Sequence, residues 1–316
     1  MSDKKSSSRT LHPILATLAG IVFVSTASLF IRFAQAEASS LVIAAARLTV
    51  ASVVLVPLAL VRNRKSPVHL SGQEWGKGLL SGLFLALHFA SWITSLEYTS
   101  IASSVVLVTT TPLWVALLSP IVLKEKISKS VWIGLVISIA GGVIVGLANI
   151  CRWDSGGLIC QAEGFTGQAM WGNALALFGA WMAAGYMLMG RQLRKKLDTV
   201  SYTALVYGTA AGILLGVVIL KAEPIFSYTP ETYFWLLALG LIPQLLGHSI
   251  LNWALKYISA AYVSLTLLGE PIGTSILAYL FLRESPTLLE GVGAVLILIG
   301  IVIGSVWRAA PSANAA

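Results

Sequence analysis

Long apolar runs make up most of the chain, and short segments that carry charges, glycine or proline separate them. A run of about 20 apolar residues can cross the roughly 30 Å hydrocarbon core of a bilayer as a helix. The runs are continuously apolar rather than alternating, which excludes the strands of a membrane barrel. We therefore predict an all-α integral membrane protein with ten transmembrane helices, over residues 14–32, 39–61, 77–96, 101–123, 130–149, 169–190, 201–220, 232–255, 260–282 and 287–307.

Composition agrees with this pattern. Hydrophobic residues make up 57% of the 316 residues and charged residues only 11%, and the mean hydropathy is +0.84. A soluble globule could not bury so much apolar surface, so membrane lipid is the expected surrounding. The apolar run at 14–32 is too long for a signal-peptide core, and we expect it to be retained as a helix.

The net charge of +8 would indicate a nucleic-acid partner in a soluble protein, but here the positions of the charges matter more. Lys and Arg fall on alternate loops, with 16 on one side of the predicted membrane and four on the other. By the positive-inside rule both termini are cytoplasmic, including the tails 1–12 and 308–316. We expect no nucleic-acid partner.

Residues 96–147 align without gaps on residues 255–306, at a constant offset of 159 positions. Thirteen of the 52 pairs are identical, and they include Pro112/Pro271 and Glu125/Glu284. The chain therefore divides into a first repeat at 13–149, a linker at 150–168 and a second repeat at 169–307. Five helices is an odd number, so the second repeat enters the membrane from the opposite side. Two inverted five-helix repeats around a central cavity are the architecture of transporters.

Both cysteines, Cys151 and Cys160, lie in the extracytoplasmic linker. A disulfide between them in an oxidising compartment and two free thiols both remain open. No metal-binding pattern accompanies them, and we expect no metal site.

Two predicted helices carry polar stripes at helical spacing. His88, Ser91, Trp92 and Ser95 share one face of the third, and Gln244, His248 and Asn252 share one face of the eighth. A polar side chain inside a bilayer is costly unless it faces protein or water, so the stripes indicate a cavity that binds substrate. The alternative is hydrogen bonding between packed helices without a ligand.

Pro112 and Pro271 lie in the middle of the fourth and ninth predicted helices, where each is expected to act as a hinge by opening backbone hydrogen bonds. Glu270 precedes the second proline and is the only acid deep within a predicted span. It binds a substrate amine, carries a proton, or is protonated and bonded to the opened backbone. Thr111 stands at the matching place in the first repeat.

Arg47 is the only basic residue well inside a predicted span. We expect it to extend its side chain towards the outer interface, and the alternative is that it neutralises a substrate carboxylate. Trp114, Trp181 and Tyr186 are candidate aromatic walls of the cavity.

The fifth and tenth predicted helices are rich in glycine, with Gly142 and Gly146 spaced as GxxxG and Gly300 and Gly304 spaced likewise. Such faces let helices approach closely. We expect them to pack within the bundle of a monomer; packing against a second protomer in a homodimer is the alternative.

No catalytic motif, phosphate-binding glycine loop or ATP-binding motif is present in the sequence, so we expect no enzymatic activity and no cofactor.

The sequence resembles the drug/metabolite transporter superfamily, and specifically its ten-helix EamA-type members. The likeness rests on Trp181 and on three segments: Ala45-Ala46-Arg47-Leu48, Thr111-Pro112 through Lys124-Glu125-Lys126, and Glu270-Pro271-Ile272 through Leu282-Arg283-Glu284. One departure is Val24-Ser25-Thr26, where members often have Trp-Gly. The resemblance implies a basket of ten helices whose central cavity is bounded by helices one to four and six to nine.

We therefore expect a transporter of a bacterial inner membrane that exports small amphipathic metabolites by alternating access. Phosphorylated substrates need several intramembrane cations, and only Arg47 qualifies. Aromatic residues, neutral hydrogen-bonding groups and one acid favour a zwitterion, namely a neutral or aromatic amino acid, over an organic cation or drug. A membrane scaffold or sensor without transport activity is a third alternative.

Overall fold

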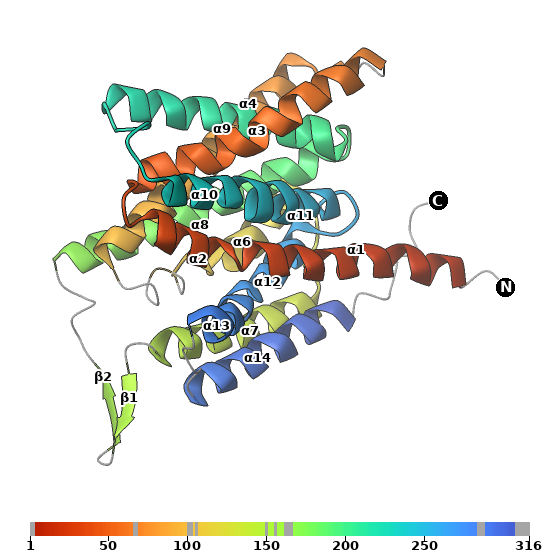
Figure 1. The fold of residues 1–316 in the computed structure, drawn as a ribbon. Helices are drawn as coiled ribbons and strands as arrows, with labels where there is room; N and C mark the ends of the chain where they lie inside the picture. The colour runs from red at the N-terminus through yellow and green to blue at the C-terminus, as the bar shows by residue number, and fades with distance from the viewer. Residues whose placement is uncertain are drawn as a thin grey trace.

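The structure is a computed structural model that describes residues 4–65, 69–99, 104, 107–148, 151–154, 157–160, 167–282 and 288–306. These residues form an almost entirely helical bundle, from which one small hairpin projects (Figure 1). The predicted C-terminal tail at 308–316 lies outside the described residues. Part of the predicted N-terminal tail, 1–12, is helical, since the first helix begins at Lys4.

Among the described residues, the first half of the chain contains the helices α1 (Lys4–Val24), α2 (Ala27–Ala34), α3 (Ser40–Lys65), α4 (Gly72–Tyr98), α6 (Thr111–Val122) and α7 (Lys129–Ala148). The linker holds β1 (Cys151–Asp154) and β2 (Gly157–Cys160). The second half contains α8 (Gln168–Leu193), α9 (Thr199–Leu220), α10 (Pro230–Leu239), the π-helix η2 (Gly240–His248), α11 (Ser249–Ala254), α12 (Ala260–Leu267), α13 (Glu270–Leu282) and α14 (Leu288–Val306).

Seven helical stretches of the described residues are long and apolar enough to cross a bilayer: 13–34, 40–64, 72–98, 168–193, 199–220, 230–254 and 260–281. Three further apolar helices, at 111–122, 129–144 and 291–304, are shorter than a full span. They correspond to the fourth, fifth and tenth predicted helices. The seven long stretches agree with the membrane prediction, and the total of ten spans stays a prediction.

Three of the predicted helices are broken in the middle. The first breaks between α1 and α2, where the hydroxyl of Ser25 donates to the carbonyl of Ile21 at 2.7 Å. The fourth and ninth start a new helix at Thr111 and at Glu270, so each proline lies in a first helical turn. Proline is tolerated there because the first backbone amides of a helix have no intrahelical partner.

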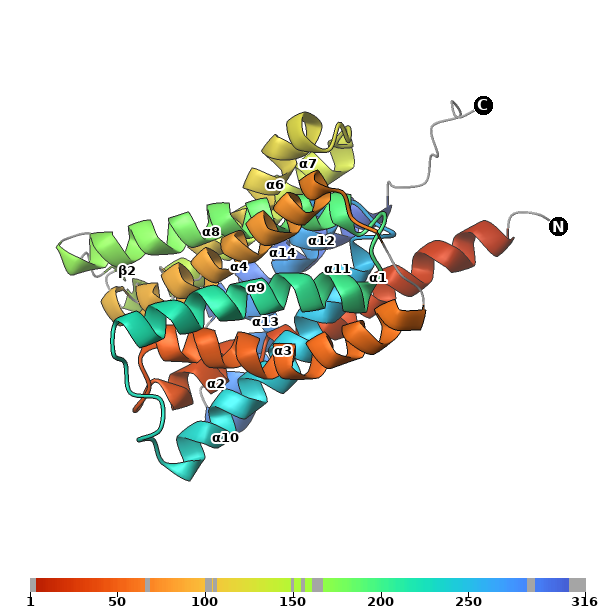
Figure 2. The same ribbon diagram turned by 90° about the horizontal axis from the view of Figure 1, so that it is seen from above.

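The two halves of the chain are interleaved rather than side by side. α4 lies between α8 and α9, and α3 packs against α9, as the view in Figure 2 shows. α7 packs along α14. Because each of these contacts joins a helix of one half to a helix of the other, the core of the bundle belongs to both halves.

α7 and α14 approach each other through glycine. A β-carbon at Gly141 would lie 2.6 Å from the carbonyl oxygen of Gly293, and one at Gly134 would collide with the carbonyl oxygen of Gly300. The pairing of 134 with 300 and of 141 with 293 means that the two helices run antiparallel. The close contact uses Gly134 and Gly141, whereas the predicted Gly142 has only the hydroxyl of Thr109, 4.0 Å away, near its missing side chain.

The linker forms an antiparallel β-hairpin in which Cys151 lies opposite Cys160. Sequence patterning predicted no strand here, because two strands of four residues give no periodic signal. The side chains of the two cysteines lie outside the described part of the structure, so the disulfide stays a prediction. The hairpin projects from the end of the bundle opposite the start of α1 (Figures 1 and 2).

Candidate functional site

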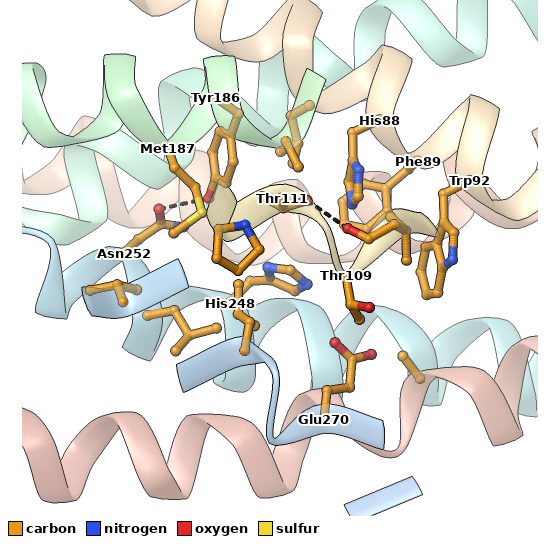
Figure 3. Close-up of a pocket in the computed structure, with 18 of the residues that line it drawn as sticks. His88, Phe89, Trp92, Thr109, Thr111, Tyr186, Met187, His248, Asn252 and Glu270 are labelled. Atoms are coloured by element: carbon orange, nitrogen blue, oxygen red, sulfur yellow. Dashed lines mark hydrogen bonds between the residues drawn. The ribbon is translucent and has the colours of Figure 1, made fainter. Parts of the chain in front are cut away.

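A cavity of about 820 Å³, a volume that includes space open to solvent, lies in the middle of the bundle. Side chains from both halves line it, and most of them are apolar or aromatic (Figure 3). The lining includes Ala27, Arg47, His88, Phe89, Trp92, Val108, Thr109, Thr111, Pro112, Ala183, Tyr186, Met187, His248, Leu251, Asn252, Leu267, Leu268 and Glu270.

Several lining positions are equivalent in the two halves, since they stand 159 residues apart in the sequence. These pairs are Ala27/Tyr186, Phe89/His248, Trp92/Leu251, Val108/Leu267, Thr109/Leu268 and Thr111/Glu270. The cavity is therefore built from the same places of the two repeats, but with different side chains.

The polar stripe on α4 divides into two kinds of residue. His88 and Trp92 line the cavity, and the Nδ1 atom of His88 lies 2.9 Å from the carbonyl oxygen of Gly179 on α8. The indole N–H of Trp92 is buried and has no hydrogen-bond partner among the described residues. Ser91 and Ser95 instead donate to carbonyls of their own helix, at 2.7 Å and 2.6 Å. Histidine and tryptophan thus face the cavity, and the serines are satisfied locally.

The stripe on the eighth predicted helix also divides. His248 and Asn252 line the cavity. Asn252 accepts a hydrogen bond from the Tyr186 hydroxyl at 2.6 Å and donates one to the Tyr207 hydroxyl at 3.0 Å. Gln244 is fully buried but does not line the cavity. The prediction that all three share one face assumed α-helical spacing, whereas residues 240–248 form a π-helix that contains Pro243.

Arg47 does not extend towards the membrane interface, so that prediction was wrong. The residue has no exposed surface and lines the cavity. Its Nε donates to the side-chain oxygen of Gln244 at 3.0 Å, and its guanidinium carbon lies 3.9 Å from the ring centre of Phe89. These two neighbours hold the side chain across the bundle interior and stop it from reaching out along its helix.

Among the described residues, Glu270 is the only one that brings a carboxylate into the cavity lining. Figure 3 shows its side chain pointing from α13 into the cavity, towards Thr109. Its backbone carbonyl accepts a hydrogen bond from the Ser25 hydroxyl at 3.2 Å. None of the three salt bridges within the described residues involves Glu270 or Arg47. The described lining therefore contains one carboxylate and one guanidinium that are not joined as an ion pair.

Tyr186 lines the cavity, whereas the other two predicted aromatic walls do not. Trp114 and Trp181 pack edge to face, with ring centres 5.4 Å apart, and Trp181 is 43% exposed. On α8 the cavity-lining residues are Ala183, Tyr186 and Met187. Trp181 precedes Tyr186 by five residues, which turns it about 140° away on an α-helix.

Of the two predicted hinge residues, Pro112 lines the cavity and Pro271 does not. Sequence reasoning missed Phe89 and Tyr207, because an aromatic residue within an apolar run gives no signal. Gln244 was singled out, but its contact with Arg47 joins residues 197 positions apart and could not be foreseen. Among the described residues no group of three or more His, Cys, Asp or Glu side chains is placed to hold a metal ion.

Comparison with known proteins agrees with this architecture. A sequence profile of the EamA-like transporter family matches residues 11–147 and again residues 170–306. The two matches are offset by 159 residues, as in the internal repeat. A solved crystal structure superimposes with a TM-score of 0.75 at 18% identity, and the match covers 93% of this chain and 97% of that one.

Curated relatives cover most of the chain. The pseudopaline exporter CntI of Pseudomonas aeruginosa is 25% identical over 289 residues, which is 92% of this chain and 94% of the relative. An uncharacterized transporter of Archaeoglobus fulgidus is 23% identical over 236 residues, or 74% of this chain and 77% of the relative. The family matches extend over most of both halves that build the cavity. The chain therefore belongs to the EamA-like transporter family, within the drug/metabolite transporter superfamily.

Proposed function

We propose that this transporter exports small amphipathic metabolites, above all neutral and aromatic amino acids, by alternating access. The observation that carries the proposal is the cavity between the two repeats, which combines aromatic rings with one base and one acid. A zwitterion with a large apolar side chain matches each of these elements. A phosphorylated substrate is disfavoured, because Arg47 is the one Lys or Arg among the described residues that line the cavity.

Alternating access requires two repeats that can exchange conformations. The antiparallel packing of α7 along α14, which are equivalent helices, supports an inverted arrangement of the repeats. In this proposal the chain crosses a bacterial inner membrane ten times, and the distribution of Lys and Arg over the loops supports cytoplasmic termini. The hairpin lies at the end of the bundle opposite the start of α1, which supports its placement outside the cell. In this proposal the linker at 150–168 separates the two repeats, and the protein acts as a monomer.

Transport of labelled phenylalanine tests the proposal directly. Proteoliposomes loaded with unlabelled phenylalanine should accumulate the label by exchange, and protein-free liposomes should not. Arg62→Gln is a suitable control variant, because Arg62 lies far along α3 with a side chain that is 59% exposed. Equal accumulation with and without protein would sink the amino-acid proposal.

Export of organic cations is the second candidate, because Glu270 and several aromatic rings line the cavity. Tetraphenylphosphonium, supplied in the same exchange assay, distinguishes the two. A protein that exchanges this cation but not phenylalanine is a cation exporter. A scaffold or sensor exchanges neither, and its melting temperature is raised by neither, since only a ligand of the folded state stabilises it.

A further inference from the structure

The strongest unexplained feature of the cavity is the free end of the Arg47 side chain. Arg47 is fully buried, and neither Nη1 nor Nη2 has a hydrogen-bond partner among the described residues. A buried charged donor without a partner is costly, and proteins normally pair such groups. Arg47 is one of the residues that line the cavity, so a ligand that enters beside it and displaces its close neighbours can supply the missing acceptors.

The neighbours of Arg47 fix which of its atoms are available. Nε donates to the side-chain oxygen of Gln244, and the guanidinium carbon lies over the ring of Phe89, 3.9 Å from its centre. The Phe89 ring is in turn held edge-on by His248, with ring centres 5.5 Å apart. The guanidinium is therefore held in one plane, and Nη1 and Nη2 are left as a pair of donors.

Two parallel N–H donors in a plane match the two oxygens of a carboxylate. No protein carboxylate takes this place in the structure, because none of the salt bridges of the described residues involves Arg47. Glu270 lines the same cavity without forming one. We propose that the guanidinium of Arg47, oriented by Gln244 and Phe89, binds the carboxylate of the transported molecule.

This inference rests on the proposed function and narrows its substrate class to amphipathic carboxylates. The body of the substrate then contacts the rings that share the cavity, Trp92 and Tyr186 among them. Arg47 and Glu270 together provide opposite charges for the two ends of an amino acid. Gln244 and Phe89 act as positioning residues, because they touch the guanidinium rather than the substrate.

Four ligands separate the carboxylate from the rest of the substrate: phenylalanine, phenylalaninamide, 3-phenylpropionate and 2-phenylethylamine. Their binding to wild-type protein in lipid nanodiscs can be measured by calorimetry. We expect phenylalanine to bind at least about tenfold more tightly than its amide, since a charged hydrogen bond contributes about 1.5–3 kcal/mol. Equal affinity of the two ligands for the wild-type protein would overturn the inference, and this comparison needs no variant.

Variants then assign the effect to Arg47. Arg47→Met should bind phenylalanine and its amide equally, and Arg47→Lys should recover part of the difference, because lysine keeps the charge but lacks the planar pair of donors. Gln244→Leu should weaken the binding of phenylalanine several-fold and leave the affinity for 2-phenylethylamine unchanged. A general loss of structure would weaken the binding of both ligands. Arg62→Gln is the control. An Arg47→Met protein that still prefers phenylalanine over its amide refutes the assignment.

The carboxylate site and the amino-acid proposal can fail separately. If 3-phenylpropionate binds the wild type but not Arg47→Met while phenylalanine is not exchanged, the site stands and amino-acid export falls. If phenylalanine is exchanged and its amide is exchanged equally well, export stands and the carboxylate site falls.

Discussion

The break in the fourth predicted helix and the break in the ninth have the same backbone and different chemistry. In both, a helix starts one residue before a proline, at Thr111 in one half and at Glu270 in the other. The Thr111 hydroxyl donates back to the carbonyl of Val108 at 2.7 Å, so the first break satisfies itself. The second break places a carboxylate in the cavity lining. Proline sets the shared geometry, and the residue before it sets the chemistry.

The same division extends across the cavity. Arg47 in the first half is matched by Val206 in the second, and Tyr186 in the second half is matched by Ala27 in the first. Glu270 in the second half is matched by Thr111 in the first, so each half contributes one charged side chain that the other lacks. The backbone of the repeat supports movement between equivalent states, whereas the unmatched side chains give the site its substrate preference.

The shared part of the repeats should be the more sensitive to mutation. Gly141→Ala places a β-carbon 2.6 Å from the carbonyl oxygen of Gly293 and should lower the free energy of unfolding by about 1–3 kcal/mol. Gly300→Ala, at the equivalent position, should lower the free energy of unfolding by a similar amount, because its β-carbon would collide with Ser138 and Gly134. Gly142→Ala is the matched control, since its nearest neighbour is 4.0 Å away. Unfolding in detergent measures all three; a harmless Gly300→Ala would break the equivalence of α7 and α14.

The unshared part should control transport. Glu270→Gln removes the one acid of the cavity lining and should lower phenylalanine exchange about tenfold, because a charged hydrogen bond to the substrate amine is lost. Thr111→Val at the equivalent place should change the rate by less than about twofold, since that hydroxyl already donates to the carbonyl of Val108. Equal losses of phenylalanine exchange in Glu270→Gln and Thr111→Val would contradict the difference between the two helix breaks.

Energy coupling adds a further measurement on the same variant. An imposed pH gradient should accelerate uptake by the wild type if Glu270 carries a proton, and the acceleration should vanish in Glu270→Gln. A gradient effect that survives in the variant assigns proton coupling to another group.

The helix caps at equivalent positions differ in strength. Asp198 accepts the amides of Val200 at 2.9 Å and Ser201 at 3.3 Å, whereas Ser39 accepts the amide of Val42 at 3.4 Å. Asp198→Ala should therefore cost about 1 kcal/mol of unfolding free energy, and Ser39→Ala less. Thermal unfolding measures both. An equal loss of unfolding free energy in Asp198→Ala and Ser39→Ala would show that the two caps stabilise their helices equally despite their different geometry.

The cap also has a predicted pH dependence. Burial alone would raise the pKa of Asp198, but hydrogen bonds from Ser201 and Val200 and the charge of Arg62 hold it below its ordinary value. A lowered pKa means that this stabilisation is present above the unfolded pKa of about 3.9 and is lost as the pH falls through the folded value. The difference in stability between wild type and Asp198→Asn should therefore disappear in acid.

The smallest effect concerns two equivalent loops. Glu37 accepts hydrogen bonds from the amide of Thr229 at 2.9 Å and the hydroxyl of Thr232 at 2.8 Å, at the start of α10. At the equivalent position, Lys196 pairs with Glu74 near the start of α4 at 2.7 Å. Exposed pairs contribute little, so Glu37→Gln and Lys196→Gln should each lower the melting temperature less than Asp198→Ala. A larger fall would give these loops a role beyond surface contact.

Sequence alone predicted the membrane class, the repeat and seven of the cavity-lining positions, because these depend on periodicity and on the cost of polar groups in lipid. The seven positions that line the cavity are His88, Trp92, Tyr186, His248, Asn252, Glu270 and Pro112. Arg47 was misplaced, because its burial depends on Gln244 and Phe89, which come from other helices. Gln244 itself lies on a π-helix that an α-helical period cannot anticipate. Trp181 was predicted to line the cavity but does not, because neither its aromatic character nor the family likeness indicates which way it faces around α8.

The glycine contact between α7 and α14 has a consequence for how the chain is made. The glycine face of α7, the last helix of the first half, packs against α14, the last helix of the second, whose contacting glycines are synthesised 152 residues or more later. Until then the bare backbone face around Gly134 and Gly141 lacks its partner. Completion of the fold therefore waits for the synthesis of α14, and a chain truncated before α14 should be degraded rather than assembled.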